Sequence, residues 1–252
     1  KMFIKLLKKL VGLFGYKLVN KNLIKNNRLL DNNNLITLND ILTYLFENEK
    51  IHNLIQIGAN DGLRFDDINK FIKKYSPRTV LVEPINVYFE NLIKNYQNYK
   101  NIFFENVAIS IGDEIEYLYK VDEKNIHNYT DHVKGLNSFD IKHLKKHGVK
   151  SRHIRKERVK TISISNLINK YFDNLDLLLI DAESYDGFII LDLLENSNYR
   201  PLIISEYIHI DSGTMAKIIA SLKKNEYSFF VIKENIICSP LEKKLSAKLG
   251  GY

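Results

Sequence analysis

Short apolar runs alternate with amphipathic segments along most of this chain. The apolar runs predict strands near residues 53–57, 79–83, 102–109, 175–181, 201–206, 227–233 and 235–239. Helical periodicity is found near residues 37–47, 65–75, 85–97, 164–172, 186–195 and 213–224. Strands that alternate with helices indicate a seven-stranded, mostly parallel sheet with helices on both faces. A short turn joins the last two strands, so this pair is the part that can run antiparallel.

A long excursion separates the third and fourth predicted strands. It spans residues 110–162 and holds a polar strand over 115–121, a helix over 138–147 and then a basic stretch. Long excursions in compact domains are usually lids or binding loops. We therefore expect a substrate lid, inserted in a single α/β domain that covers residues 35–252.

Residues 1–34 form an N-terminal helical extension in this interpretation. Apolar side chains recur at helical spacing over 2–18 with lysines opposite, and an Asn-rich linker follows over 20–34. A short basic amphipathic helix can lie on an anionic membrane surface, contact a partner subunit or pack on its own domain. The pattern leaves these three alternatives open, and peripheral membrane contact is one of them.

The positive charge of the chain is unevenly placed. Residues 1–30 hold eight of the 37 Lys and Arg and no acid, which leaves 29 basic residues against 30 acids elsewhere. The basic balance therefore does not indicate a nucleic-acid-binding domain. The single cysteine, Cys238, argues against a disulfide framework. No cleavable signal peptide is evident and no apolar run reaches the roughly 18–20 residues of a membrane-spanning helix, so a cytoplasmic protein is expected.

A glycine turn between the first two predicted strands points to a nucleoside-containing ligand. The first strand ends at Gly58, a second glycine follows at Gly62, and the next strand ends in Glu83. In open α/β sheets, this arrangement binds ligands at the carboxyl ends of the strands, and the acid takes the ribose hydroxyls. The GxxxG spacing lacks the pyrophosphate fingerprint GxGxxG. It favours S-adenosylmethionine (SAM), which has a ribose and no phosphate.

Further acids follow the strands predicted near 175–181 and 201–206. Asp181 and Glu183 come after the first of these strands, and Glu206 ends the second, with His209 just beyond. Because the carboxyl ends of parallel strands meet at one edge, we expect these four side chains to converge as catalytic candidates. Capping of the following helix is the alternative role for Asp181 or Glu183.

Four motifs occur in a fixed order and spacing. They are Gln56-Ile57-Gly58-Ala59-Asn60-Asp61-Gly62, Val82-Glu83-Pro84, Asn106-Val107-Ala108-Ile109-Ser110 and Asp181-x-Glu183-x-x-Asp186. Together they resemble the FkbM-type SAM-dependent methyltransferases. The lid segment 135–144 is similar to the Gly-x-x-Ser-Phe-Asp-x-x-His-Leu segment of one branch. The resemblance covers roughly residues 50–210, and it implies a Rossmann-like class I methyltransferase fold and O-methylation of sugars, glycolipids or natural products.

The resemblance also implies site roles. Residues 58–62 would wrap the methionine part of SAM, Glu83 would bind the ribose, and the turn at 107–108 would lie against adenine. The implied cofactor-binding residues are Gln56, Gly58, Ala59, Asn60, Asp61, Gly62, Glu83, Pro84, Val107 and Ala108. Two departures matter: Gln56 stands where methyltransferases often carry an acid near the ligand's amino group, and Ser184 replaces the family's usual glycine.

Methyl transfer from SAM to an alcohol needs alignment and a base. His209 is the best base on intrinsic pKa and Asp181 is the best on position. A divalent ion held by Asp181 and Glu206 is a third route, but nothing in the sequence demands a metal. Our hypothesis at this point is base catalysis without a metal, and no metal ligand is assigned.

The lid is strongly basic and predicts an anionic acceptor. Residues 141–160 carry nine Lys or Arg and one acid, Glu157. The predicted acceptor-binding residues are Ser138, His143, Lys145, His147 and Arg152. His143 and His147 lie four apart, a spacing also compatible with metal binding, although a solvated helix face is the simpler interpretation.

Three other functions compete with this prediction. A ribose methyltransferase acting on nucleic acid is disfavoured, because no lysine lies between Asp181 and Glu206. A nicotinamide-dependent oxidoreductase lacks the third glycine. A non-catalytic docking module would keep the fold with a decayed SAM pocket. We expect no nucleic-acid partner, and the sequence does not define the oligomeric state.

Overall fold

The computed structural model describes residues 36–64, 66–111 and 115–241. The predicted amphipathic helix over 2–18 and the Asn-rich linker over 20–34 lie outside the described residues. The chain divides into two compact units, Lys1–Ile41 and Leu42–Tyr252. The sheets and the candidate site belong to the second unit. Within the described residues, no helix is both long and apolar enough to cross a membrane.

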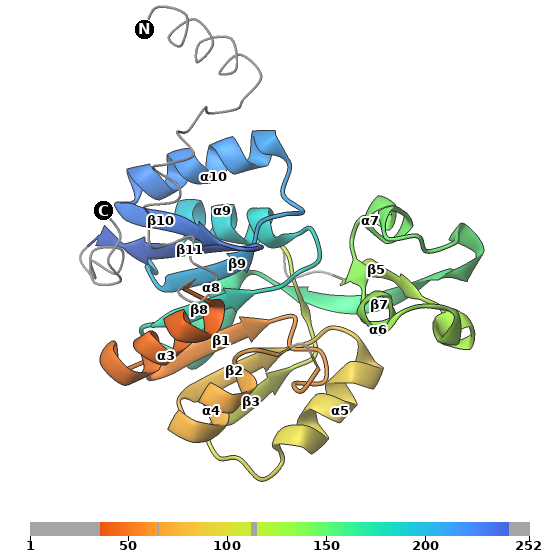
Figure 1. Cartoon of the computed structure of the whole chain (residues 1–252), viewed down its shortest axis with the longest axis horizontal. Helices are drawn as coiled ribbons and strands as arrows, with labels where there is room; N and C mark the ends of the chain where they lie inside the picture. The colour runs from red at the N-terminus through yellow and green to blue at the C-terminus, as the bar shows by residue number, and fades with distance from the viewer. Residues whose placement is uncertain (1–35, 65, 112–114, 242–252) are drawn as a thin grey trace, which may run out of the picture. The chain divides into compact units, whose positions relative to one another are not determined.

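Seven strands form the main sheet in the order β10-β11-β9-β8-β1-β2-β3 (Figure 1). They are β1 (Asn53–Ile57), β2 (Arg78–Val82), β3 (Ile102–Glu105), β8 (Leu177–Ile180), β9 (Leu202–Glu206), β10 (Tyr227–Ile232) and β11 (Asn235–Pro240). The first five of these pair in parallel, whereas β11 is antiparallel to both β9 and β10. The predicted seven-stranded, mostly parallel sheet and its antiparallel closing pair are confirmed.

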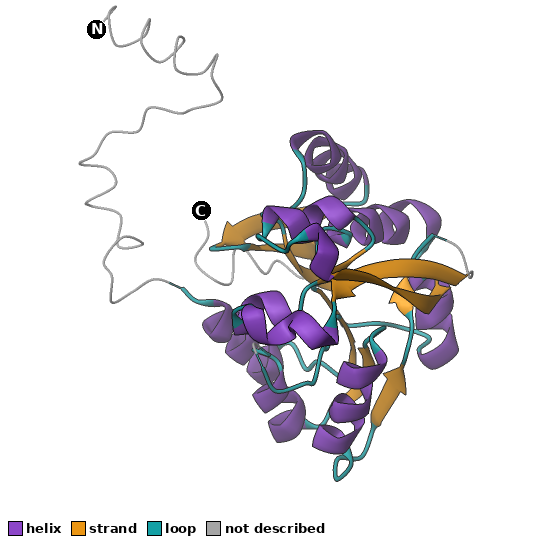
Figure 2. Ribbon diagram, turned by 90° about the vertical axis from the view of Figure 1, so that its right-hand side faces the viewer, coloured by secondary structure: helices purple, strands orange, loops and turns teal. Residues whose placement is uncertain are grey.

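Helices lie on both sides of the sheet (Figure 2). They are α3 (Leu38–Asn48), α4 (Asn69–Tyr75), α5 (Asn86–Tyr96), α8 (Ile164–Tyr171), α9 (Asp186–Asn196) and α10 (Ser212–Lys224). Residues of α8, α9 and α10 pack with strand residues such as Ile55, Val80 and Leu178 in one buried cluster. The alternate strand residues, Leu54 and Leu81, are also fully buried. Burial of both faces explains why these strands read as continuous apolar runs.

The helix predicted over 65–75 begins later than its periodicity suggested. Asp66 Oδ1 accepts hydrogen bonds from the backbone N–H groups of Ile68 and Asn69, at 3.0 and 3.2 Å. An acid that takes these donors fixes a turn before the helix. The helix α4 therefore starts at Asn69, and Asp66 is left in the loop that follows β1.

The lid folds around a second sheet in the order β4-β7-β5-β6. Its elements are β4 (Ala108–Ile109), β5 (Ile115–Val121), η2 (Glu123–Asn128), α6 (Asp131–Lys134), β6 (Asn137–Ser138), α7 (Ile141–Lys146), η3 (Ser151–His153) and β7 (Ile154–Ile162). In Figure 1 this green segment extends beyond the carboxyl ends of the central strands. The polar strand predicted over 115–121 is confirmed as β5.

Two expectations about the lid and its border were wrong, and the basic stretch forms an element that was not predicted from the sequence. The run 102–109 forms two strands in different sheets, and between them Asn106 Nδ2 donates to the carbonyls of Glu83 and Pro84. The helix predicted over 138–147 is shorter, because residues 137–138 pair with β5 and Asp140 caps the helix. The basic stretch contains the nine-residue strand β7, which pairs with β5 from Ile154 to Lys160.

Gly62 allows the first glycine turn to pack on α5. A Cβ at this position would lie 2.5 Å from Tyr96 Cε2 and 2.6 Å from Leu92 Cδ1, and φ is +71°. We expect Gly62→Ala to lower the free energy of unfolding by about 2–4 kcal/mol, through overpacking and left-handed strain. Urea unfolding measures this change.

Gly148→Ala is the matched control. Gly148 has φ +82°, but a Cβ there would meet no atom within 4 Å. The free energy of unfolding of this variant should fall by only about 1–2 kcal/mol, which is the cost of a side chain in the left-handed conformation. Equal losses in the two variants would contradict the packing role assigned to Gly62.

Candidate active site

The first glycine turn holds three strand ends together. The N–H groups of Gly58 and Ala59 both donate to the carbonyl of Val82 at 3.0 Å, and the N–H of Asp181 donates to the carbonyl of Ile57 at 3.1 Å. Gly58 has φ +78°, and a Cβ there would lie 1.9 Å from the carbonyl oxygen of Asp181. Only glycine fits, because the turn passes directly against the end of β8.

The rest of the predicted turn is ordered by its own side chains. Asn60 adopts a left-handed conformation at φ 48°. Asp61 Oδ1 accepts from the N–H groups of Leu63 and Arg64, and the Asp61 carbonyl accepts from Asn95 Nδ2 at 2.8 Å. The residues predicted to wrap the methionine part of SAM therefore form one continuous hydrogen-bonded turn.

Glu83 is a buried carboxyl group that organises the turn. Its side chain is 1% exposed. One oxygen accepts from the N–H of Asn60 at 3.0 Å and the other from the N–H of Ile85 at 2.8 Å. Burial raises the pKa of Glu83 to about 7, although these two hydrogen bonds favour the charged form. Glu83, which is predicted to bind the ribose, thus also joins the glycine turn to the start of α5.

Ala108, predicted to lie against adenine, belongs to β4, which pairs with β7 in the second sheet. It is buried in a cluster with Ile85, Leu118 and Val159, and so packs against side chains from β5 and β7. Its neighbour Val107 is half-buried and packs at the edge of the main core. The lid therefore covers the region between the ends of β2 and β3.

Asp66 is a site residue that sequence reasoning missed. The Gln56 side chain lies against the Asp66 carboxyl, and burial raises the pKa of Asp66 to about 6. Gln56 is 8% exposed, and its Oε1 has no hydrogen-bond partner among the described residues. The structure thus places an acid beside the position where Gln56 departs from the family pattern. The Asp-Asp pair at 66–67 was the available signal, but it was assigned to a helix.

Carboxylates gather where β8 and β9 end. Asp181 keeps exposed surface, yet desolvation by the surrounding protein and the charges of Glu183, Asp186 and Glu206 raise its pKa well above the usual range. Burial, followed by Glu183 and Asp186, raises the pKa of Glu206 to about 7. Asp186 is 1% exposed and accepts from the N–H of Ala182 at 3.2 Å. The predicted convergence of strand-end acids is present in the structure.

The loop after β8 has a left-handed backbone at two successive residues. Glu183 has φ 48° and Ser184 has φ 86°. The positive φ gives a physical reason for a glycine at the second position, and Ser184 bears strain there of about 1–3 kcal/mol. Ser138 of the lid holds this loop, because its hydroxyl donates to the carbonyl of Glu183 at 2.7 Å and lies 3.1 Å from Ser184 Oγ. Neither Asp181 nor Glu183 provides a side-chain cap for α9, whose N-cap residue is Tyr185.

Three histidines from the lid and from the loop after β9 lie together. His143 Nε2 is 2.9 Å from Glu183 Oε2, and His209 Nε2 is 3.6 Å from Glu206 Oε2. The ring of His143 is 4.7 Å from that of His147 and 4.8 Å from that of His209, between centroids. Burial, and then the His143 charge, lowers the pKa of His209. The structure thus unites the predicted residues Ser138, His143 and His147 with the strand-end acids.

The two basic residues predicted to bind the acceptor, Lys145 and Arg152, make no hydrogen bond or ion pair with the strand-end acids among the described residues. Lys145 is exposed on α7, and Arg152 is exposed with its Nε 3.3 Å from His153 Nε2. Lys146 lies near enough to His209 to contribute to lowering its pKa. Several lid charges are already paired within the lid, since Lys120 contacts Glu157, and Arg155 contacts Asp122 at 3.1 Å.

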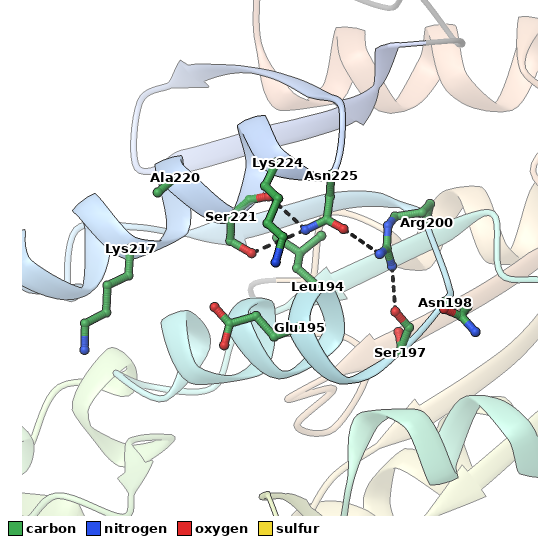
Figure 3. A pocket seen from close by; sticks show the side chains of 10 residues that line it. All are labelled: Leu194, Glu195, Ser197, Asn198, Arg200, Lys217, Ala220, Ser221, Lys224 and Asn225. Carbon is green, nitrogen blue, oxygen red and sulfur yellow. Dashed lines mark hydrogen bonds between the residues drawn. The ribbon is translucent and has the colours of Figure 1, made fainter.

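A depression of about 630 Å³ lies elsewhere, where α9 and α10 end (Figure 3). It is lined by Leu194, Glu195, Ser197, Asn198, Arg200, Lys217, Ala220, Ser221, Lys224 and Asn225. The Arg200 guanidinium donates to the carbonyls of Ser197 and Tyr199 and to Asn225 Oδ1. Arg200 therefore serves the local structure at the amino ends of the strands, away from the acids.

Residues 56–229 match the family model for the methyltransferase FkbM domain. The chain belongs to the FkbM methyltransferase family. The match includes the glycine turn, Glu83, the lid and the strand-end acids, and with it the fold is a Rossmann-like class I methyltransferase fold. No curated protein matches the chain.

Solved structures of methyltransferases resemble this FkbM family member only distantly. An FkbM methyltransferase from Methylobacillus flagellatus aligns with 10% identity and a TM-score of 0.43 over 75% of this chain and 43% of that one. The chain thus spans less than half of that protein. A ribosomal protein L11 methylase from Lactobacillus delbrueckii gives 9% identity, a TM-score of 0.40, and coverage of 79% and 75%. A precorrin-6y C5,15-methyltransferase from Geobacter metallireducens aligns with 10% identity and a TM-score of 0.39, over 81% of this chain and 88% of that one.

Glu83 makes the stability of this FkbM domain depend on pH. Its pKa is about 7 in the folded state, against an ordinary value of 4.5 for a glutamate in water. The folded state therefore binds this proton more tightly, so stability from Glu83 is complete below about pH 4.5 and is lost as the pH rises through 7. Relative to Glu83→Gln, the wild type should lose about 2 kcal/mol of unfolding free energy between about pH 5 and pH 7.5.

Urea unfolding of both proteins at these two pH values measures the difference. Any fixed cost of the amide next to two N–H donors cancels, because it is the same at both pH values. A stability gap that stays constant with pH would contradict the raised pKa of Glu83.

Proposed function

We propose that this protein uses SAM to methylate a hydroxyl group of an anionic sugar or a related small molecule. Membership of a methyltransferase family supports the reaction class. The observation that carries the proposal is the contact between the turn at Gly58 and the end of β8, where a Cβ on Gly58 would meet the Asp181 carbonyl oxygen at 1.9 Å. This contact holds a carboxylate beside the turn that would bind the methyl donor.

The residues around the turn fit SAM. The missing side chain at Gly58 lets the turn pack directly against the end of β8, which places the backbone of the turn beside Asp181. The buried Gln56 Oε1 lacks a donor among the described residues, and the ammonium group of SAM is a donor of the right kind. Asp66, next to Gln56, supplies the negative charge that the family's acid would otherwise provide. Glu83 retains lone pairs for the ribose hydroxyls after accepting its two backbone hydrogen bonds.

Asp181 is the base in this proposal. SAM supplies an electrophilic methyl group when bound, so the chain must orient the acceptor and remove its hydroxyl proton. Desolvation, followed by the charges of neighbouring carboxylates, raises the pKa of Asp181, which makes its carboxylate a stronger proton acceptor. Of the other candidates, Glu183 is engaged with His143, and Glu206 lies beside His209. We assign these two acids and His209 to the environment of the base.

The charge of the lid supports an anionic acceptor. Lys145 and Lys146 are exposed on α7, the helix whose His143 reaches Glu183. A phosphate or carboxylate on the acceptor would be attracted to these lysines and to Arg152, while its hydroxyl lies toward the acids. Phosphorylated or nucleotide-linked sugars are therefore the first acceptors to examine.

Cofactor binding is tested by thermal unfolding with S-adenosylhomocysteine, the demethylated product of SAM. About a 100-fold excess over its Kd should raise the midpoint by roughly 5–10 °C, and NAD should cause no shift. Asp66→Asn should weaken the affinity at least about tenfold, because a buried charge partner of the ammonium is lost. Asp67→Asn is the control, since Asp67 is exposed. A shift with NAD alone, or none at all, would overturn the assignment of SAM.

Methyl transfer is tested with tritium-labelled SAM and a panel of sugar phosphates, nucleotide sugars and the matching neutral sugars. We expect an alkali-stable methyl ether, formed preferentially on the charged acceptors. Asp181→Asn should lower kcat by roughly 10²–10⁴-fold through loss of the base, with the thermal shift by S-adenosylhomocysteine unchanged. Labelling of RNA instead would favour the nucleic-acid alternative, and cofactor binding with full activity in Asp181→Asn would remove Asp181 as the base.

A further inference from the structure

The three clustered histidines carry out no step of the proposed methyl transfer. One ring nitrogen of each of His143, His147 and His209 lies within 4.8 Å of those of the other two. His143 lies on α7, His147 is the residue after its last turn, and His209 lies between β9 and α10. Two separate parts of the fold thus bring three imidazoles to one point.

Interactions with the nearby acids do not satisfy every ring nitrogen of the three histidines. His143 Nε2 is hydrogen-bonded to Glu183, but Nδ1 of His209 is buried without a hydrogen-bond partner among the described residues. A buried polar atom with no partner costs free energy, and its presence calls for a ligand. Lys146 adds a nearby positive charge, so protonated imidazoles would repel one another and this lysine.

We propose that His143, His147 and His209 bind one divalent transition-metal ion of the zinc class. Imidazole nitrogens suit Zn²⁺, Co²⁺ and Ni²⁺, whereas Mg²⁺ prefers oxygen ligands. Three histidines with a fourth position left open is a known coordination pattern for zinc. Zn–N bonds of about 2.0–2.1 Å put tetrahedral nitrogens roughly 3.4 Å apart, so the rings must close by about 1.4 Å from the 4.8 Å limit.

The acids beside the cluster have the geometry of supporting partners. Glu183 Oε2 lies 2.9 Å from His143 Nε2, which leaves Nδ1 of His143 for the ion. Glu206 Oε2 lies 3.6 Å from His209 Nε2, whereas the other ring nitrogen of His209, Nδ1, has no hydrogen-bond partner among the described residues. Carboxylates that accept from the second ring nitrogen orient histidine ligands in many metal sites.

The ion would tie the lid to the main sheet. His143 and His147 belong to the lid, and His209 follows the last parallel strand. Binding at this site does not rest on the proposed methyl transfer, and it is measurable with the metal alone.

The test uses the full chain, freed of any histidine tag and stripped with EDTA. Titration calorimetry with Zn²⁺ should give one ion per chain, Co²⁺ should give the absorption of a tetrahedral complex, and Mg²⁺ should not compete. Excess Zn²⁺ should raise the unfolding midpoint by roughly 5–10 °C. His147→Ala and His209→Ala should each weaken binding at least about tenfold, whereas His127→Ala, exposed on the lid, should not.

Hydrogen exchange on the wild type supplies a measurement that does not depend on a variant folding. Zn²⁺ should slow exchange of the α7 amides and of residues 207–210 together. The proposal is overturned if Zn²⁺ fails to saturate at one site, if the two histidine variants bind as tightly as the wild type, or if protection appears elsewhere. Cofactor binding in the absence of metal does not affect any of these outcomes.

Discussion

The close approach of β1 to β8 is the constraint on which the site depends. Gly58 passes so near the carbonyl of Asp181 that no side chain fits between them. Hydrogen bonds from this turn to Val82 and from Asp181 to Ile57 extend the parallel pairing by one step beyond each strand. As a result, three strands end at one level, and the groups that follow them are held by backbone geometry.

Acids with raised pKa values gather around these strand ends. Glu83, Asp66, Asp181 and Glu206 all have raised pKa values, chiefly because folding removes water from their carboxyl groups. Such an arrangement destabilises the fold at neutral pH unless a ligand or partner compensates the charge. A positive charge on His143 provides part of that compensation, because it lowers the pKa of Glu206.

The lid contacts the site through residues that lie far from it in the sequence. Ser138 and His143 reach the loop after β8, 40 or more residues away, and hold its strained residues Glu183 and Ser184. One hydroxyl and one imidazole thus connect the lid to the loop that follows β8. This connection explains how a two-residue strand and a six-residue helix can matter to the site.

The sequence by itself determined the main sheet, the glycine turn and the convergence of acids. Buried parallel strands need uninterrupted apolar runs, and their ends must meet at one edge. Only the tertiary structure decided where Asp66 lies, how β3 and β4 separate at Asn106, and that the basic residues 154–162 form a strand. These features depend on partners far along the chain: β7 is a strand because β5 pairs with it, and local propensity does not report such pairing. The three histidines come together for the same reason, because their meeting point is set by packing of the lid and not by their spacing in sequence.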